Sequence, residues 1–174
     1  DLLVRFEAGG ATRMSTPRPR LRMTAHALLI DSSGRVLLIR TETGTWALPS
    51  TVLTFEVQPY RQTVAFVRQV LGIEVAERDL LLAHISAHRS VTGLAGLGLV
   101  ISVGHWIGQP VPTRASVTDT PTRQPTRQWC SPGQPPAPLA AWDAAVLPAL
   151  LTNTPYAEIG WNPCPTPDSA RAPS

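Results

Sequence analysis

The feature that most constrains the fold is a helix-length apolar pattern framed by Pro59 and Gly72. Proline is tolerated in the first turn of a helix, and glycine is the common residue that closes one. Apolar residues recur between them at i, i+4, i+7 and i+11, and these are Tyr60, Val64, Val67 and Leu71. Such spacing places one apolar stripe along a helix. We therefore predict a helix near 58–71 with one face against a core.

Short apolar runs before and after this helix are typical of strands. Residues 23–30 and 36–39 flank the turn sequence Asp-Ser-Ser-Gly, which predicts a β-hairpin over 23–40. Further extended segments are expected at 46–48, 79–86, 97–103 and 127–130, and a second helix at 138–151. Pro148 is expected to kink or end that second helix. The order predicts a mixed α+β protein with a helix on either side of a sheet.

The length of 174 residues suits one domain with irregular ends. We expect a flexible N-terminal segment at 1–21 that lies outside the fold, with Met14 as a candidate native start. The domain then spans 22–161 and contains a proline-rich loop at 110–126. Residues 162–174 read as a disordered tail.

Composition excludes several classes of protein. No run approaches 18 apolar residues and no secretory signal is visible, so we expect a cytoplasmic protein without a membrane-spanning helix. All 15 basic residues are arginine and 18 residues are proline, which indicates a GC-rich, bacterial-type coding bias. The arginines are scattered, and the net charge is only +3. Nucleic-acid binding needs a basic face or stripe, so it is not predicted.

Cysteine and histidine give weak signals. Cys130 and Cys164 lack zinc-site spacing and leave open one disulfide or two separate thiols. His84 and His88 would share a strand face and could bind a metal or act as a base, but they have no evident carboxylate partner. The glycines of GLAGLGLV at 93–100 end in a strand rather than opening a helix, so they do not predict a phosphate-binding loop.

Four strings, taken in order, resemble the Nudix family: RVLLIRTETGTWALPS at 35–50, VRQVLGIEV at 67–75, RQWCSP at 127–132 and WDAAVLPALL at 142–151. The resemblance covers about residues 22–161. It implies an α/β/α sandwich with a mixed β-sheet. It also implies a relationship to hydrolases of nucleoside-diphosphate-linked compounds, in which helix glutamates hold Mg²⁺ or Mn²⁺.

The chain departs from the family signature, G-x5-E-x7-R-E-U-x-E-E-x-G-U with U a bulky aliphatic residue. Anchored on Gly72 and Ile73, the signature glycine falls on Thr51. The glutamate and arginine positions hold Val57, Ala65, Phe66, Gln69 and Val70. Hard divalent cations need anionic oxygen ligands, which these side chains lack. We therefore predict no catalytic residue and no metal at these positions.

Displaced carboxylates are the alternative. Glu56, Glu42 and Glu74 lie near the signature segment and are the candidates that could restore Mg²⁺- or Mn²⁺-dependent hydrolysis. Otherwise Phe66 and Val70, four residues apart, would pack with Phe55 and Val57 in a small apolar cluster where the metal would be. For ligand binding the candidates are Arg40, a bidentate anion ligand, and Trp46, a stacking platform.

Three functions compete. The first is a non-catalytic module that binds a nucleotide-like small ligand or a protein. The second is an active Nudix hydrolase that uses displaced carboxylates, and the third is a purely structural copy. The sequence predicts no oligomeric state.

Overall fold

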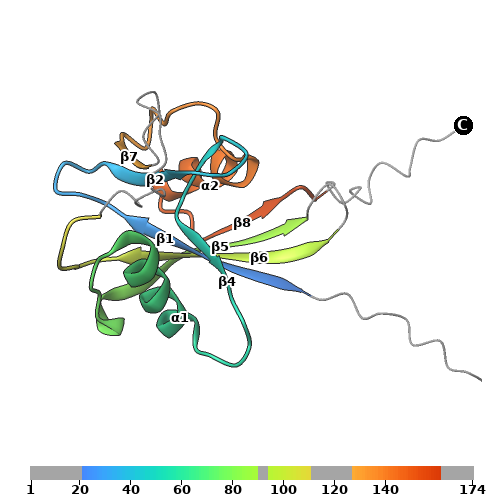
Figure 1. Ribbon diagram of the computed structural model, residues 1–174. Coiled ribbons are helices and arrows are strands. Elements are labelled where there is room, and N and C mark those ends of the chain that lie inside the picture. The colour runs from blue at the N-terminus through green and yellow to red at the C-terminus, as the bar shows by residue number, and fades with distance from the viewer. Residues whose placement is uncertain (1–20, 90–93, 111–126, 162–174) are drawn as a thin grey trace, which may run out of the picture.

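The computed structural model describes residues 21–89, 94–110 and 127–161, which are coloured in Figure 1. Nearly all of the predicted N-terminal segment and proline-rich loop lie outside the described residues, as do the whole tail, Met14 and Cys164. The predictions for those segments therefore remain predictions.

The described strands form two sheets. They are β1 (Arg22–Leu29), β2 (Val36–Arg40), β3 (Trp46–Ala47), β4 (Ser50–Val52), β5 (Leu80–Arg89), β6 (Ala95–Val103), β7 (Arg127–Cys130) and β8 (Tyr156–Ile159). The larger sheet has the order β4-β1-β6-β5-β8 and is mixed, because β1 runs parallel to β6 and β5 parallel to β8. The smaller sheet, β3-β2-β7, is antiparallel.

The predicted hairpin over 23–40 is wrong, although both of its strands and its turn form. A single bridge joins Ile30 and Val36, and beyond it the strands separate into different sheets. The physical reason is burial: β1 and β2 are largely buried on both faces, and each lies as an inner strand between two others. The hairpin turn therefore serves as the link between the two sheets.

The helix predicted at 58–71 is confirmed. It consists of α1 (Pro59–Phe66), continued by a π-helical turn over Val67–Leu71, and it closes at Gly72 with φ of 71°. A short 3₁₀ turn, Glu77–Asp79, leads into β5. The second helix, α2 (Ala141–Leu151), continues past Pro148 rather than ending there. No helix in the described part of the chain is long and apolar enough to cross a membrane.

Helices cover opposite faces of the sheets, which makes the α/β/α sandwich (Figure 1). On the α1 side the core combines β1 and β6 with Val67 and Leu71 of the π turn. On the α2 side Leu28 and Val100 pack with Val146 and Leu147. The central strands are therefore buried on both faces.

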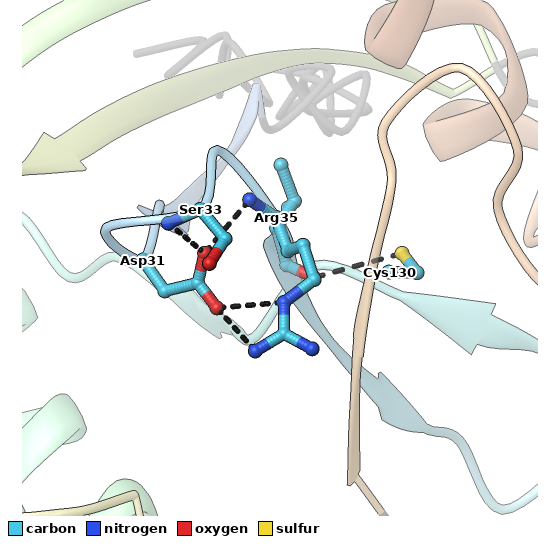
Figure 2. A network of polar contacts seen from close by, with 5 residues as sticks. Asp31, Ser33, Arg35 and Cys130 are labelled. Atoms are coloured by element: carbon cyan, nitrogen blue, oxygen red, sulfur yellow. Dashed lines mark hydrogen bonds and ion pairs between the residues drawn. The ribbon is translucent and has the colours of Figure 1, made fainter.

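The turn between β1 and β2 is fixed by one carboxylate, as Figure 2 shows. Asp31 Oδ1 accepts hydrogen bonds from the backbone N–H groups of Ser33 and Arg35, both at 2.9 Å, and Oδ2 pairs with the Arg35 guanidinium at 2.8 Å. Beside the turn, the buried Cys130 thiol donates to the carbonyl oxygen of Val36 at 3.5 Å. Cys130 is a free thiol.

We predict that Gly72→Ala destabilises the protein by about 1–2 kcal/mol, because a residue with a Cβ is strained in the left-handed region. Gly133→Ala is the matched control, since a Cβ there meets no atom within 4 Å and its φ is not left-handed. Urea unfolding of both variants measures the effect. Equal stability of the two variants would contradict the assigned helix end.

Candidate functional site

The signature segment runs from β4 through an exposed loop into α1 and the π turn. Val57 lies in that loop with 46% of its surface exposed. Ala65 and Gln69 face solvent, whereas Phe66 and Val70 are half-buried and pack against the α1-side core. Of the three glutamate positions on the helix, the one held by Gln69 thus faces solvent, and those held by Phe66 and Val70 face the core.

The predicted apolar cluster forms only in part. Phe66 and Val70 join the periphery of the α1-side core, which also includes Trp106 and Trp129 with ring centroids 6.4 Å apart. Phe55, in contrast, is 83% exposed, and Val57 is also exposed. The loop side of the predicted cluster is therefore wrong, because the loop residues turn outward while the helix residues pack inward against the α1-side core.

These residues do not fit a divalent metal. Valine and phenylalanine side chains offer no oxygen, and Gln69 offers one neutral carbonyl oxygen. Among the described residues, no three His, Cys, Asp or Glu side chains form a group that could hold a metal ion. No catalytic step through a metal is derived from this geometry.

The displaced carboxylates are not brought together. Glu42 lies exposed in the turn between β2 and β3, and Glu56 lies exposed in the signature loop, where it lines a pocket of about 250 Å³. Glu74 accepts from Arg68 Nε at 2.8 Å and is held beyond the helix, where its backbone bridges to Ile107. Each glutamate therefore occupies a separate surface environment.

A cation lies beside the signature helix. Arg127, at the start of β7, pairs across the sheet with Ile39, and its Nη2 donates to the carbonyl oxygen of Val70. Burial lowers the pKa of Arg127, yet guanidinium remains charged in proteins. No spacing pattern could predict this contact, because Val70 and Arg127 are 57 positions apart.

The two predicted ligand residues lie side by side. The Arg40 guanidinium carbon lies 6.0 Å from the centre of the Trp46 ring, and Arg40 Nε donates to Gly44 O at 3.2 Å. Trp46 is only 6% exposed and packs into the α2-side core. Stacking of a ligand on Trp46 would require this buried ring to become accessible, whereas Arg40 is half-buried.

The α2 face of the larger sheet carries a group of polar side chains that sequence reasoning did not assemble. His26 on β1 stacks on Trp142 of α2, with ring centroids 3.6 Å apart and planes 13° from parallel. Trp142 Nε1 donates to Ser86 Oγ on β5 at 2.9 Å. The signal in the sequence was alternation in β1, which puts the polar His26 among apolar neighbours on a buried strand.

Burial controls the charge of these histidines. It lowers the pKa of His26 to about 3, with a smaller contribution from the nearby His88, so His26 is neutral at neutral pH. Burial also lowers the pKa of His88. His84 and His88 do share the predicted strand face: His84 pairs with Val100, and His88 with Gly96.

Asp143 is a second residue that the sequence analysis missed. It is 3% exposed in the first turn of α2, and its Oδ1 accepts the backbone N–H of Leu48 at 2.7 Å. Burial raises its pKa to about 6, against the opposing effect of backbone hydrogen bonds. This carboxylate therefore ties the segment before the signature loop to α2.

Comparison with known proteins identifies the fold. No family model matches the chain, and no curated protein matches its sequence. Solved structures do resemble it. A MutT NUDIX hydrolase from Burkholderia pseudomallei is 21% identical, with TM-score 0.57 over 74% of this chain and 97% of that one.

Two others are MutT proteins. That of Bacillus halodurans is 14% identical, with TM-score 0.60 over 79% of this chain and 88% of that one. That of Methanosarcina mazei Go1 is 16% identical, with TM-score 0.59 over 79% and 97%. The chain therefore has the Nudix fold, with the α/β/α sandwich that the resemblance implied.

We predict that Asp143→Asn changes how stability depends on pH. The folded pKa, about 6, exceeds the ordinary value of 3.8, so the folded state binds the proton more tightly and wild-type stability falls as pH rises from about 4 to 6. The difference of about 2.2 pKa units corresponds to about 3 kcal/mol. Asparagine keeps an acceptor for Leu48, so the variant should gain up to that amount relative to wild type at neutral pH.

Urea unfolding from about pH 2.5 to about pH 7.5 measures this change. Asp31→Asn is the control for which stability should change with pH in the opposite direction. The pKa of Asp31 is lowered, mainly because its carboxylate accepts a hydrogen bond from the Arg35 backbone N–H. The stability of the wild type relative to Asp31→Asn should therefore rise as pH increases toward about 4, the ordinary range of an aspartate pKa, and stay level above it. Parallel curves for Asp143→Asn and wild type would contradict the buried, proton-retaining carboxylate.

Proposed function

We propose that this Nudix-fold protein is a binding module for a small, nucleotide-like ligand and does not hydrolyse diphosphates with a metal. One observation carries the proposal: two signature glutamate positions hold Phe66 and Val70, whose side chains pack against the α1-side core. Burying a hydrated Mg²⁺ there without anionic ligands would cost several kcal/mol. Such a site has no means of activating water at a phosphate through a metal.

The other face of the sheet supports ligand binding. His26 and His88 each have a buried Nδ1 with no hydrogen-bond partner among the described residues, and an aromatic ring lies against His26. Buried polar groups are usually paired, and unpaired ones in a fold that commonly hosts ligands favour a bound molecule or water. Nucleotides combine a flat ring with polar edges, which suits stacking and imidazole hydrogen bonds.

The competing hydrolase function has one observation in its favour, the place of Glu56 in the pocket of the signature loop. A hydrolase would need further carboxylates to converge on it. A protein partner in place of a small ligand is the other version of the binding proposal. The two experiments below separate these functions.

We expect at least one member of a panel of nucleotides and nucleotide sugars to raise the thermal midpoint of the intact protein, since a ligand that binds only the folded state stabilises it. The panel is run with EDTA, so that binding without metal is measured. His26→Leu should abolish the shift, whereas Arg35→Ala, in the distant hairpin turn, should leave it unchanged. No shift with any member would overturn the small-ligand proposal and leave a protein partner.

We also predict no Mn²⁺ binding by calorimetry and no metal-dependent diphosphate hydrolysis in the parent protein. A restored variant carries glutamate at 57, 66, 69 and 70 and arginine at 65, and it should bind Mn²⁺. The matched control carries glutamine at the same four positions, equally polar but without charge, and circular dichroism confirms that each variant folds. Micromolar Mn²⁺ binding together with turnover by the parent would establish the displaced-carboxylate hydrolase instead.

A further inference from the structure

On the face toward the start of α2, the larger sheet has a position without a side chain, Gly98. Gly98 of β6 lies opposite Ser86 of β5 on the face toward α2. A Cβ on Gly98 would lie 2.6 Å from Ser86 Oγ and 2.6 Å from Trp142 Cζ2, distances that real Cβ atoms do not show. Glycine is therefore required for a flat ring to lie this close to the strand.

His26, Ser86 and Gly98 together form a slot with the Gly98 backbone at its base. His26 supplies a ring face, Gly98 the bare backbone and Ser86 a hydrogen-bond acceptor. The indole of Trp142 uses all three, because it stacks on His26 at 3.6 Å and donates from Nε1 to Ser86 Oγ at 2.9 Å. Strands β1, β5 and β6 thus form, on the face toward α2, one slot that fits a flat aromatic ring.

The indole does not satisfy every polar group of the slot. His26 is only 8% exposed, and its Nδ1 has no hydrogen-bond partner among the described residues. An indole has one N–H, which goes to Ser86, so it has nothing left to offer the imidazole. The plane of the imidazole, in which Nδ1 bonds, therefore has room for a polar group that the indole does not supply.

The position of Trp142 would also allow its indole to move out of the slot without moving α2. Trp142 is the second residue of α2 and is half-buried at the margin of the α2-side core, whereas the residues that anchor α2, Val146 and Leu147, are fully buried a turn further along. Rotation of the Trp142 side chain leaves those anchors in place.

We propose that the slot of His26, Ser86 and Gly98 is the binding site for the ring of the ligand, and that Trp142 is a resident ring which a flat heteroaromatic ligand displaces. This inference rests on the proposed function and adds to it a location and a built-in competitor. In the intact protein Trp142 then occupies the slot. A ring ligand binds more weakly, because moving Trp142 out costs free energy.

The test is Trp142→Ala, titrated calorimetrically with indole and with benzothiophene, a ring of similar shape without an N–H. We expect both to bind, with indole about threefold to tenfold tighter because of one hydrogen bond to Ser86. Adding Ser86→Ala should abolish that preference. Trp161→Ala is the control: it removes an exposed indole, one that donates to Ala87 O, and should create no indole site.

Absence of indole binding to a folded Trp142→Ala protein, or equal binding by Trp161→Ala, would overturn the slot. If Trp142→Ala fails to fold alone, recovery of cooperative unfolding on adding indole supports the slot, and no recovery overturns it. Any nucleotide that binds the intact protein should bind Trp142→Ala more tightly, and weaker binding would overturn the displacement. Indole binding with no nucleotide binding to either protein would keep the slot while refuting the nucleotide-like ligand.

Discussion

The contact between the signature helix and the two sheets is the interaction on which the rest of the structure depends. Val67 and Leu71 are fully buried in a core shared with Leu37 of the smaller sheet and Ile101 of the larger one. Full burial of one such side chain contributes about 1.5–3 kcal/mol. Because only one backbone bridge joins β1 to β2, this core holds the two sheets together on the α1 side.

Replacing signature carboxylates by apolar residues extends the same contact. In a metal site the glutamates would face water and a cation, and their desolvation would have to be offset by ligation. Here Phe66 and Val70 pack against the α1-side core, and the Arg127 guanidinium donates a hydrogen bond to a carbonyl oxygen of the π turn. The α1 face has gained hydrophobic packing where metal chemistry would otherwise take place, while the polar groups of the sheet gather on the α2 face.

Much of the fold could be predicted from the sequence, because periodicity is a local signal. The helix ending at Gly72 was predicted by apolar spacing and one glycine, and most strands by short apolar runs. β4 and β8 were missed, since Ser50–Val52 and Tyr156–Ile159 have little apolar character and form through pairing with β1 and β5. The separation of the hairpin strands likewise depends on distant partners.

The candidate site was less predictable for the same reason. The loss of carboxylates could be found by counting along one segment. The His26–Trp142 stack could not, because its residues come from opposite ends of the chain and are joined only when β1, β5, β6 and α2 assemble. Asp143 reads as an ordinary surface charge until its hydrogen bond to Leu48 is seen.

The central claim is that the signature helix packs against the core and holds no metal. It is tested most directly by adding Mn²⁺ to the ¹⁵N-labelled protein and measuring paramagnetic broadening of each backbone amide signal. The account predicts no selective broadening from 57 to 74. Selective loss of signals around Phe66, Val70 and Glu74 at substoichiometric Mn²⁺ would contradict it.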